Sequence, residues 1–303
     1  MVSDILLIYN PKAGDANFRF SLDRFIELFS DEKHRQICVF RSTMAGDAEK
    51  YVNECDLTFV SSIFIAGGTG TVNEVVNALM KRDIHIPIGV IPAGTENEFA
   101  HKLGFVSKEL EDNFQALRDM DPIPVDIGCA NGQYFVDSFT SGTLNSLSKV
   151  STDAKNTFGS MAYYVMGMTS IRNARRMKLC IETREKRYTG FFSYFAVINT
   201  NLMTVPRSST GQFTLVASKN NSFNGDSHYF NPTYGRTGVV ENGVVRLVSD
   251  YFHITQLDAD EGKAATCIDG DMGPDLPLKI TVERGAMEFF QNGRGRAGYN
   301  NHK

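Results

Sequence analysis

One stretch, residues 61–80 (SSIFIAGGTGTVNEVVNALM), constrains the fold more than any other part of the sequence. An apolar run ends in two glycines, a third glycine follows, and apolar residues then recur at helical spacing. This order is typical of a strand, a tight turn and a helix in a sheet of parallel strands. Backbone N–H groups at the start of such a helix favour an anion, so the stretch predicts a turn that holds phosphate.

The same order repeats along the first part of the chain. Strand-like runs at 4–10, 36–43, 61–68 and 86–94 alternate with helix-like segments at 20–31, 46–54, 71–83 and 95–104. After Asp126, strand-like segments dominate, and the exception is a helical insert at 158–176. We therefore predict an α/β plus β protein. Residues 1–125 are expected to form an α/β domain with a parallel sheet, and residues 126–303 a second, mostly β domain.

The composition narrows the classes of protein to consider. Hydrophobic residues make up 42% of the chain and charged residues 22%, which is typical of a globular protein. The net charge of −4 gives no support to a nucleic-acid partner. The five cysteines form no CxxC pair, as expected for reduced thiols. Without a signal peptide or an apolar run of about 20 residues, the sequence predicts a cytoplasmic protein.

Three glycine-bearing turns follow strands of the first domain: residues 10–14 (NPKAG), 67–71 (GGTGT) and 92–97 (PAGTEN). In a parallel sheet all three lie at the carboxyl ends of the strands, where such sheets bind ligands. Thr71 with Glu74, and Thr95 with Glu98, fit the capping-box pattern at a helix start. Similar turns also occur in α/β proteins that bind no phosphate, and neither standard phosphate motif is met. The turns alone leave both interpretations open.

Taken in order, the three turns resemble the catalytic domain of the diacylglycerol kinase and bacterial lipid kinase family. That family has NPxxG, GGDGTxNEVxN and PxGTxNDFA, where this chain has YNPKAG, GGTGTVNEVVN and PAGTENEFA. STMAGDA, VDIG, YFVDSFTSG, KNTFGSMAYYVMG and IDGD are also similar to family segments. The resemblance therefore spans almost the whole chain. It implies that residues 1–125 are a nucleotide-binding domain and that residues 126–303 are an antiparallel β-sandwich domain, whose last segment can return to the first domain. NAD kinases share the GGDGT turn, but NEVVN and GTENEFA fit the lipid branch better.

The resemblance implies a reaction: transfer of the γ-phosphate of ATP to a lipid hydroxyl, such as that of diacylglycerol. It also implies nucleotide contacts at positions in the turns, which in this chain are Asn10, Pro11, Lys12, Ala13, Gly14, Ser42, Gly67, Gly68, Thr69, Gly70, Thr71, Asn73 and Thr95. Lys12 is also explained as a solvated charge in a loop. The lipid itself is not identified by the sequence.

The family's proposed catalytic base is the glutamate of a DGE turn. At that position the chain has Asp271, with Asp269 two residues earlier. An aspartate can accept the proton of the substrate hydroxyl, although its carboxylate reaches about one methylene less far. The alternative is a plain Asp-Gly hairpin turn.

The chain departs from the family where magnesium would bind. Thr69 replaces the aspartate of GGDGT, and a hydroxyl supplies no negative charge to a metal that prefers carboxylate oxygens. Glu98 and Asp126 remain as the predicted Mg²⁺ ligands. A second metal site of the family is expected to be absent, because Thr210 stands where a carboxylate is needed, near Arg207. Three hypotheses stay open: an active lipid kinase, a degenerate relative that senses nucleotide or lipid, and a chain whose Thr69 is not the natural residue.

A lipid kinase must meet its substrate at a membrane surface. Residues 168–178 place basic side chains beside an apolar, methionine-rich run; these are Arg172, Arg175, Arg176 and Lys178. Such a segment could bring the protein transiently to an anionic bilayer. A core helix followed by a solvated basic turn is the simpler explanation of this segment. A β-rich second domain with exposed edges could also pair as a homodimer.

Overall fold

The computed structural model describes residues 4–14, 16–30, 36–95, 97–142, 176–203, 209–219, 240–241, 243–259 and 264–292. The chain divides into two compact units, residues 1–125 with 286–303, and residues 126–285. It passes from one unit to the other within strand β5 (Pro122–Ala130) and within strand β17 (Leu278–Phe290). The expected helical insert at 158–176, with Arg172 and Arg175, lies outside the described residues except for Arg176, and Arg207 lies outside them too.

The first unit is built on a parallel sheet. Its strands, in spatial order, are β2 (Ile37–Arg41), β1 (Asp4–Tyr9), β3 (Val60–Gly67) and β4 (Ile88–Pro92). The last part of β17 joins beside β4, where Phe289 lies opposite Ile88. The strand order reverses direction between β1 and β3. In open α/β sheets such a reversal is where ligands bind, at the carboxyl ends of the strands.

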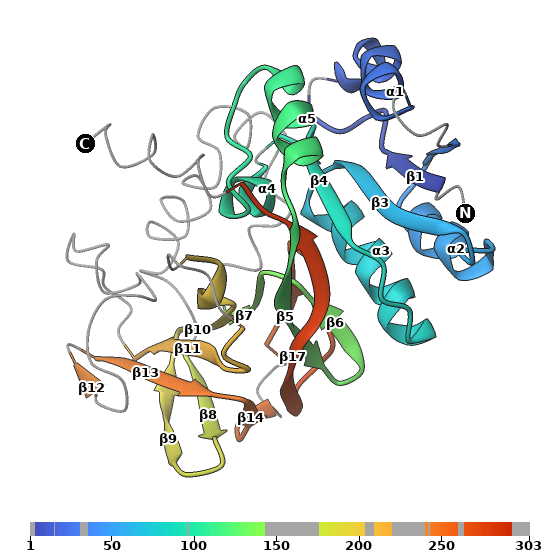
Figure 1. Cartoon of the computed structure of the whole chain (residues 1–303). Helices are drawn as coiled ribbons and strands as arrows, with labels where there is room; N and C mark the ends of the chain where they lie inside the picture. Colours follow the sequence, from blue (N-terminus) through green and yellow to red (C-terminus); the bar gives the residue numbers. More distant parts are fainter. Residues whose placement is uncertain are drawn as a thin grey trace. The chain divides into compact units, whose positions relative to one another are not determined.

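Helices cover both faces of this sheet (Figure 1). They are α1 (Leu22–Ser30), α2 (Asp47–Glu54), α3 (Thr69–Arg82), α4 (Glu98–Lys102) and α5 (Leu110–Asp119), with a 3-10 turn at Phe18–Phe20. Helices α1 and α5 pack through aromatic side chains, because Phe25 contacts Phe64 of β3 and Phe114 of α5. The sequence analysis missed α5, although its buried residues include Phe114 and Leu117.

Both capping-box predictions are wrong. Helix α3 begins at Thr69, so Thr71 lies inside its first turn and Gly68 is the N-cap. Helix α4 begins at Glu98 and has Asn97 as its N-cap, which shortens the helix expected over 95–104. Neither helix has a side-chain cap. The first capping box is absent because the carboxylate of Glu74 binds N–H groups at the start of α2 and not of its own helix.

The second unit is mostly β. One antiparallel sheet has the order β12 (Val240–Glu241), β13 (Val244–Ser249), β11 (Phe213–Ser218), β10 (Tyr194–Ile198), β7 (Ser138–Gly142), β15 (Thr266–Ile268) and β16 (Asp271–Met272). Other antiparallel pairs join β5 to β6 (Gln133–Phe135) and β17 to β14 (Tyr251–Gln256). Strand β14 pairs in turn with β8 (Met177–Glu182), and β8 pairs with β9 (Arg187–Phe192). A short 3-10 turn, Thr200–Met203, follows β10.

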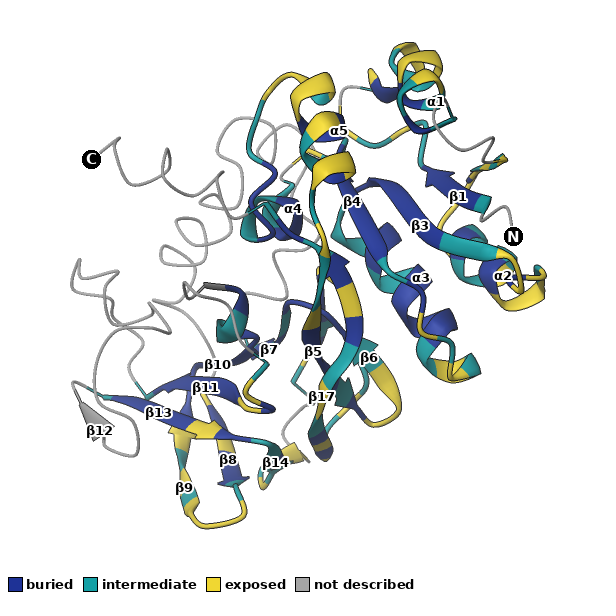
Figure 2. Ribbon diagram, viewed as in Figure 1, coloured by how far each residue is buried: buried dark blue, intermediate teal, exposed yellow. Residues whose placement is uncertain are grey.

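One hydrophobic core joins the two sets of strands in this unit. Phe195 and Leu215 of the antiparallel sheet lie in the same buried cluster as Ile181, Phe252 and Ile280 from the other strands. Buried positions alternate with more exposed ones along β14, whereas β10 and β11 are buried along their whole length (Figure 2). Two layers of strands that share one core form a sandwich. The predicted fold class, a parallel α/β part followed by a mostly β part, is confirmed.

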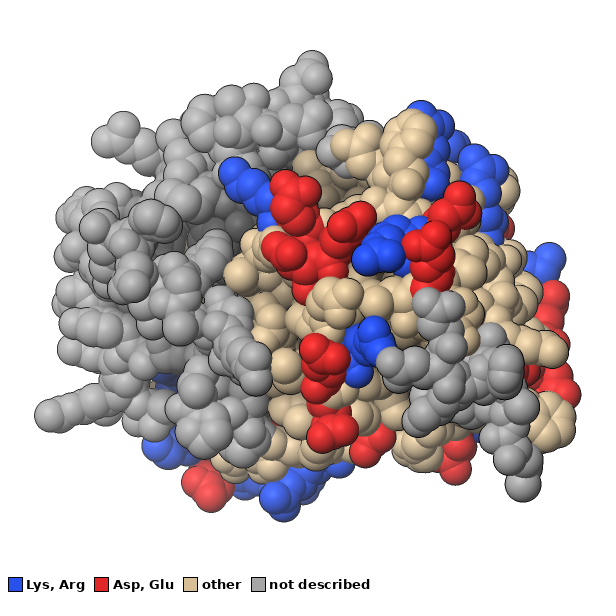
Figure 3. Space-filling model, turned by 45° about the horizontal axis from the view of Figure 1, so that its top comes forward, with Lys and Arg blue, Asp and Glu red and all other residues tan. Residues whose placement is uncertain are grey.

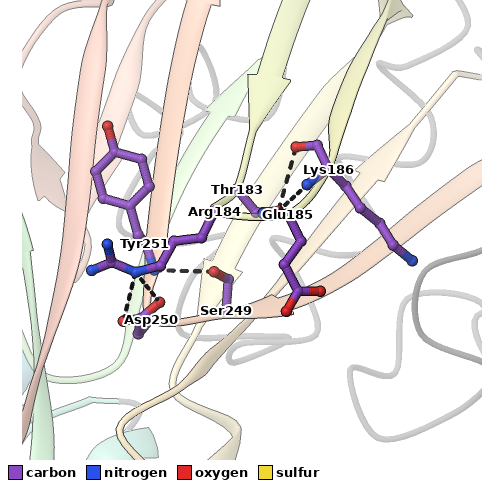
Figure 4. Close-up of polar contacts among 7 residues, drawn as sticks. All are labelled: Thr183, Arg184, Glu185, Lys186, Ser249, Asp250 and Tyr251. Atoms are coloured by element: carbon purple, nitrogen blue, oxygen red, sulfur yellow. Dashed lines mark hydrogen bonds and ion pairs between the residues drawn. The ribbon is translucent and has the colours of Figure 1, made fainter.

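The turns at one end of this unit are joined by exposed polar contacts (Figure 4). Arg184, in the turn between β8 and β9, donates from Nε to both carboxylate oxygens of Asp250 at 3.0 Å. Its guanidinium also lies 5.4 Å from the ring centre of Tyr251. Thr183 closes its own turn by accepting hydrogen bonds from the N–H groups of Glu185 and Lys186.

Candidate functional site

The three glycine turns of the first unit touch one another. A Cβ on Gly94, in the third turn, would lie 2.8 Å from the Cα of Gly68 in the second turn. A Cβ on Gly14, in the first turn, would lie 2.8 Å from the carbonyl oxygen of Ala93 and 2.9 Å from that of Gly94. Only glycine allows backbones to approach this closely. The fold therefore joins residues 10–14, 67–71 and 92–97 into one surface at the carboxyl ends of the strands.

The first turn is shaped by Asn10. Its side-chain oxygen accepts a hydrogen bond from the N–H of Lys12 at 2.9 Å, and its carbonyl oxygen accepts one from Ala13 at 3.1 Å. The N–H of Asn10 is bound to Ala66 at the end of β3. Gly14 has φ +57°, which favours glycine. Pro11 and Ala13 are half-buried, whereas Lys12 and Gly14 are exposed.

The second turn leaves the start of α3 open. Gly68 is the N-cap, no side chain caps the helix, and a Cβ on Gly68 would meet nothing within 4 Å. Thr69 and Gly70 occupy the first helical positions, whose N–H groups have no acceptor within the helix. Gly67 lies close to Thr71, because a Cβ on Gly67 would be 2.8 Å from the Oγ1 of Thr71. Such a helix start offers donors and a positive dipole end to an anion.

Asn73 follows on the same helix and is engaged within it. The Nδ2 of Asn77 donates to the side-chain oxygen of Asn73 at 2.9 Å and to its carbonyl oxygen at 3.0 Å. The side chain of Asn73 therefore has a helical partner, whereas the turn before it presents backbone. Its predicted contact with the nucleotide stays a prediction.

The third turn depends on a residue that sequence reasoning missed. Asn97 adopts a left-handed conformation, φ +49°, and its side-chain oxygen accepts the N–H of Gly94 at 2.6 Å. This bond closes the turn around Thr95, which is exposed. Asparagine tolerates this conformation better than most residues, and its place just before a helix was the available signal.

Ser42 lies beside the first turn. Its N–H donates to the carbonyl oxygen of Tyr9, the last residue of β1, at 3.0 Å. Its hydroxyl approaches the same oxygen at 3.4 Å, and the residue is buried. Ser42 thus joins the end of β2 to the turn at Asn10, in the same unit as the other predicted nucleotide contacts.

In the second unit the two predicted catalytic aspartates have different surroundings. Asp269 is 8% exposed, and its carboxylate accepts the N–H groups of Val136, Asp137 and Ser138 at 2.7–2.9 Å. Asp271 is exposed at the start of β16. Three backbone donors hold Asp269 as a structural anchor, so Asp271 is the better placed of the two to act as a base.

These aspartates belong to a two-residue hairpin. Ile268 pairs with Asp271, and the residues between them, Asp269 and Gly270, have φ +48° and +98°. Positive φ at both positions is the geometry of a type I′ turn. The Asp-Gly hairpin weighed in the sequence analysis is therefore present, and it leaves Asp271 exposed at its end.

Asp126 is the centre of a second buried network. It is 1% exposed, and one carboxylate oxygen accepts the N–H of Gly211 and the Nδ2 of Asn201, at 2.8 and 2.7 Å. The other oxygen accepts the N–H of Gly285 at 2.8 Å and the hydroxyl of Ser209. A carboxylate has about four lone-pair sites, and four donors occupy them. A metal ion could bind Asp126 directly only by displacing one of these donors.

The other positions considered for metal binding do not supply the ligands that Asp126 cannot offer. The carboxylate of Glu98 is paired with Lys102, one turn later in α4, at 3.0 Å. The hydroxyl of Thr210 donates to the side-chain oxygen of Asn201 at 2.9 Å, and Thr69 carries no charge. In the ranges that the structure describes, no three His, Cys, Asp or Glu side chains gather as a metal-binding group. These residues do not fit a Mg²⁺ ion held directly by the protein, and the metal roles of Glu98 and Asp126 stay predictions.

Comparison with known proteins finds the family that the sequence resembles, over a range that lies mostly in the first unit. Residues 4–130 match the family model described as the diacylglycerol kinase catalytic domain. A diacylglycerol kinase of Bacillus subtilis (strain 168) is 35% identical over 196 residues, which are 64% of each chain. The match thus spans slightly less than two thirds of that relative's length.

Longer but weaker similarities cover almost the whole chain. A Streptococcus pneumoniae protein, provisionally named a lipid kinase, is 27% identical over 94% of this chain and 97% of its own. A Bacillus anthracis crystal structure, provisionally named a diacylglycerol kinase, has a TM-score of 0.78 at 23% identity. It covers 96% of this chain and 98% of that one, and the likeness concerns the fold.

The family match and the geometry refer to the same part of the chain. The segment 4–130 contains all three turns that meet at Gly14, Gly68 and Gly94. Among the described helices none is long and apolar enough to cross a bilayer. The resemblance to this family, first noticed in the turns, is confirmed. Residues 4–130 of this chain are similar to the diacylglycerol kinase catalytic domain family.

Proposed function

We propose that the protein is an ATP-dependent lipid kinase, which transfers the γ-phosphate to a lipid hydroxyl such as that of diacylglycerol. The observation that carries this proposal is the contact between the three glycine turns beside the open start of α3. Backbone N–H groups there suit the phosphates of a nucleotide. The names of the related proteins support a lipid as the acceptor.

In this proposal Asp271 takes the proton from the lipid hydroxyl. The hydroxyl oxygen forms a bond to the γ-phosphorus, the bond from that phosphorus to the bridging oxygen breaks, and ADP leaves. Asp271 suits this role because it is exposed, while the carboxylate of Asp269 is held by three backbone donors. Phosphoryl transfer depends mainly on positioning and on neutralising charge. The glycine turns supply donors for both, and no step here depends on a metal held by the protein.

The second candidate function is a degenerate relative that binds nucleotide or lipid as a sensor without efficient catalysis. The contacts at the predicted metal positions favour it, because Thr69 is neutral, Glu98 is paired with Lys102, and Asp126 is saturated by four donors. Transient contact with a membrane, pairing as a homodimer and a cytoplasmic location stay predictions under both candidates. Arg176 and Lys178 are the basic residues of that segment that the structure describes, and both are exposed.

The charges on the protein surface do not by themselves indicate which kind of membrane the protein contacts. On the face drawn in Figure 3, acidic and basic side chains of the described residues are interspersed. Such a face gives little attraction to an anionic surface. Substrate identity therefore has to come from an assay with several lipids.

The test measures transfer of labelled γ-phosphate from ATP to a panel of lipid alcohols in vesicles with magnesium. We expect labelled lipid from the unaltered protein and a loss of about 10²-fold or more with Asp271→Asn, because the base is removed. Glu185→Gln, an exposed carboxylate in the same unit, is the control and should keep the full rate. Labelling only after Thr69→Asp would favour the degenerate relative, and no labelling by either protein would exclude the kinase.

A further inference from the structure

Glu74 leaves its own helix to bind the start of another. It lies half-buried on α3, and its two carboxylate oxygens accept the N–H of Gly46 at 2.8 Å and the N–H of Ala48 at 3.1 Å. These N–H groups belong to the N-cap and the first turn of α2, which has no side-chain cap of its own. Gly46 has φ +86°, so the chain turns sharply here into the helix.

The other end of α2 is also held by α3. The guanidinium of Arg82 donates to the carbonyl oxygen of Cys55 at 3.1 Å and to that of Val52. A carboxylate thus lies at the amino end of α2 and a cation at its carboxyl end, as the helix dipole favours. Midway, Lys81 pairs with Glu49 at 2.7 Å. Helix α2 is therefore fastened to α3 along its whole length.

The loop before α2 is fixed at both ends. At its start, Ser42 is bound to Tyr9 of β1. Within it, one oxygen of Asp47 accepts the hydroxyl and N–H of Thr43 at 2.6 and 2.7 Å, and the N–H of Met44 at 3.0 Å. These hydrogen bonds, that of the Thr43 hydroxyl first, lower the pKa of Asp47. At its end the N–H of Gly46 is bound by Glu74, and the carbonyl oxygen of Gly46 accepts the N–H of Lys50 within α2.

We propose that Glu74 is a positioning residue for nucleotide binding, which locks the 42–46 loop to the glycine turn that begins α3. The same helix carries Glu74 and, one turn earlier, Thr69 and Gly70. Through Glu74 the loop that contains Ser42 keeps a fixed place relative to those N–H groups. This inference rests on the proposed function, because it assumes that the turns hold a nucleotide.

The chemistry of the contact requires a carboxylate. Two N–H donors point at two oxygens, and glutamine offers one oxygen and an NH₂ group. In Glu74→Gln one N–H of α2 would face another donor, so that end of the loop would loosen. Aspartate keeps both oxygens on an arm one methylene shorter, which should preserve part of the effect.

The test compares the unaltered protein with Glu74→Gln and with the control Glu49→Gln. The control removes a charge from the same pair of helices but leaves the start of α2 intact. Hydrogen exchange of residues 42–54 reports the loop, and titration with a fluorescent ATP analogue reports binding. With Glu74→Gln we expect faster exchange at Gly46 and Ala48 and roughly tenfold weaker nucleotide binding. The KM for ATP should rise more than kcat falls, and the control should stay within about twofold.

Each outcome bears on the proposal. Faster exchange with unchanged nucleotide affinity would overturn it, because Glu74 would then only stabilise the fold. If the unaltered protein binds no nucleotide, the proposed function fails and the positioning role fails with it. An unchanged Glu74→Gln beside an unaltered protein that does bind would remove the positioning role alone. If Glu74→Gln does not fold, Glu74→Asp answers the question, with an intermediate loss of affinity expected and full affinity contradicting the proposal.

Discussion

The two units differ in what binds the backbone N–H groups of the turns compared here. In the second unit buried carboxylates fill the turns: Asp269 binds three N–H groups, and Asp126 binds two, together with two side chains. In the first unit the turns at Gly14, Gly68 and Gly94 press backbone against backbone, and the start of α3 has no side-chain cap. At these turns of the second unit the protein supplies its own carboxylates, as Glu74 also does at the start of α2, whereas the start of α3 leaves room for an external anion.

This difference separates two uses of the same physical interaction. A carboxylate that binds several N–H groups fixes a loop permanently, because both partners belong to the protein. Open N–H groups at a glycine turn are satisfied by water until a charged ligand arrives. The contrast predicts that substituting the buried carboxylates of the second unit lowers stability. Substitutions at the open turn before α3 can instead lower nucleotide affinity while the fold is kept.

The largest effect is expected from Asp126→Ala. It would leave four donors without their acceptor in a buried network, at a cost of about 3–5 kcal/mol in the free energy of unfolding. Urea unfolding of the full chain measures this cost. Glu185→Ala, an exposed acid in the same unit, should change the free energy by less than about 0.5 kcal/mol. Equal effects of the two substitutions would break the comparison.

Two glycine substitutions in the first unit sharpen the comparison between the units. Gly94→Ala places a Cβ 2.8 Å from the Cα of Gly68, so backbone must move, at about 1–3 kcal/mol. Gly68→Ala meets nothing within 4 Å and has an ordinary φ of −84°, so its stability should change by less than about 1 kcal/mol.

The two glycine variants should also differ in how much nucleotide affinity they lose for a given loss of stability. The methyl group of Gly68→Ala would occupy the space beside the start of α3, so we expect nucleotide affinity to fall about tenfold while the fold is kept. Thermal unfolding and nucleotide titration of both variants give the two readouts. Undiminished affinity in Gly68→Ala would mean that the open turn does not receive the anion.

The smallest effect is expected from Arg184→Ala. The ion pair with Asp250, drawn in Figure 4, lies between side chains that are 65% and 41% exposed, so water and salt screen it. Its thermal unfolding should match that of the Glu185→Ala control at physiological salt. A clear destabilisation would show that exposed turns also fasten the second unit.

Much of the first unit could be predicted from the sequence. Apolar runs that end in glycine turns gave the strands of the parallel sheet, because local pattern and burial agree there. Helix starts were less accurate. Glu74 fitted a capping box with Thr71, but it binds Gly46, 28 residues earlier. Helix α5 was missed because its apolar spacing is short and sits among acidic residues.

The sequence by itself determined the order of strands and glycine turns, the family similarity of residues 4–130, and the absence of a carboxylate at Thr69. The tertiary structure alone decided what the remaining carboxylates do. Asp126 is bound by Gly285, 159 residues later, and Asp269 by residues more than 130 positions earlier. A carboxylate looks the same in a sequence whether it is buried and saturated or exposed and reactive. Only the folded chain decides whether a carboxylate is buried, like Asp269, or exposed, like Asp271.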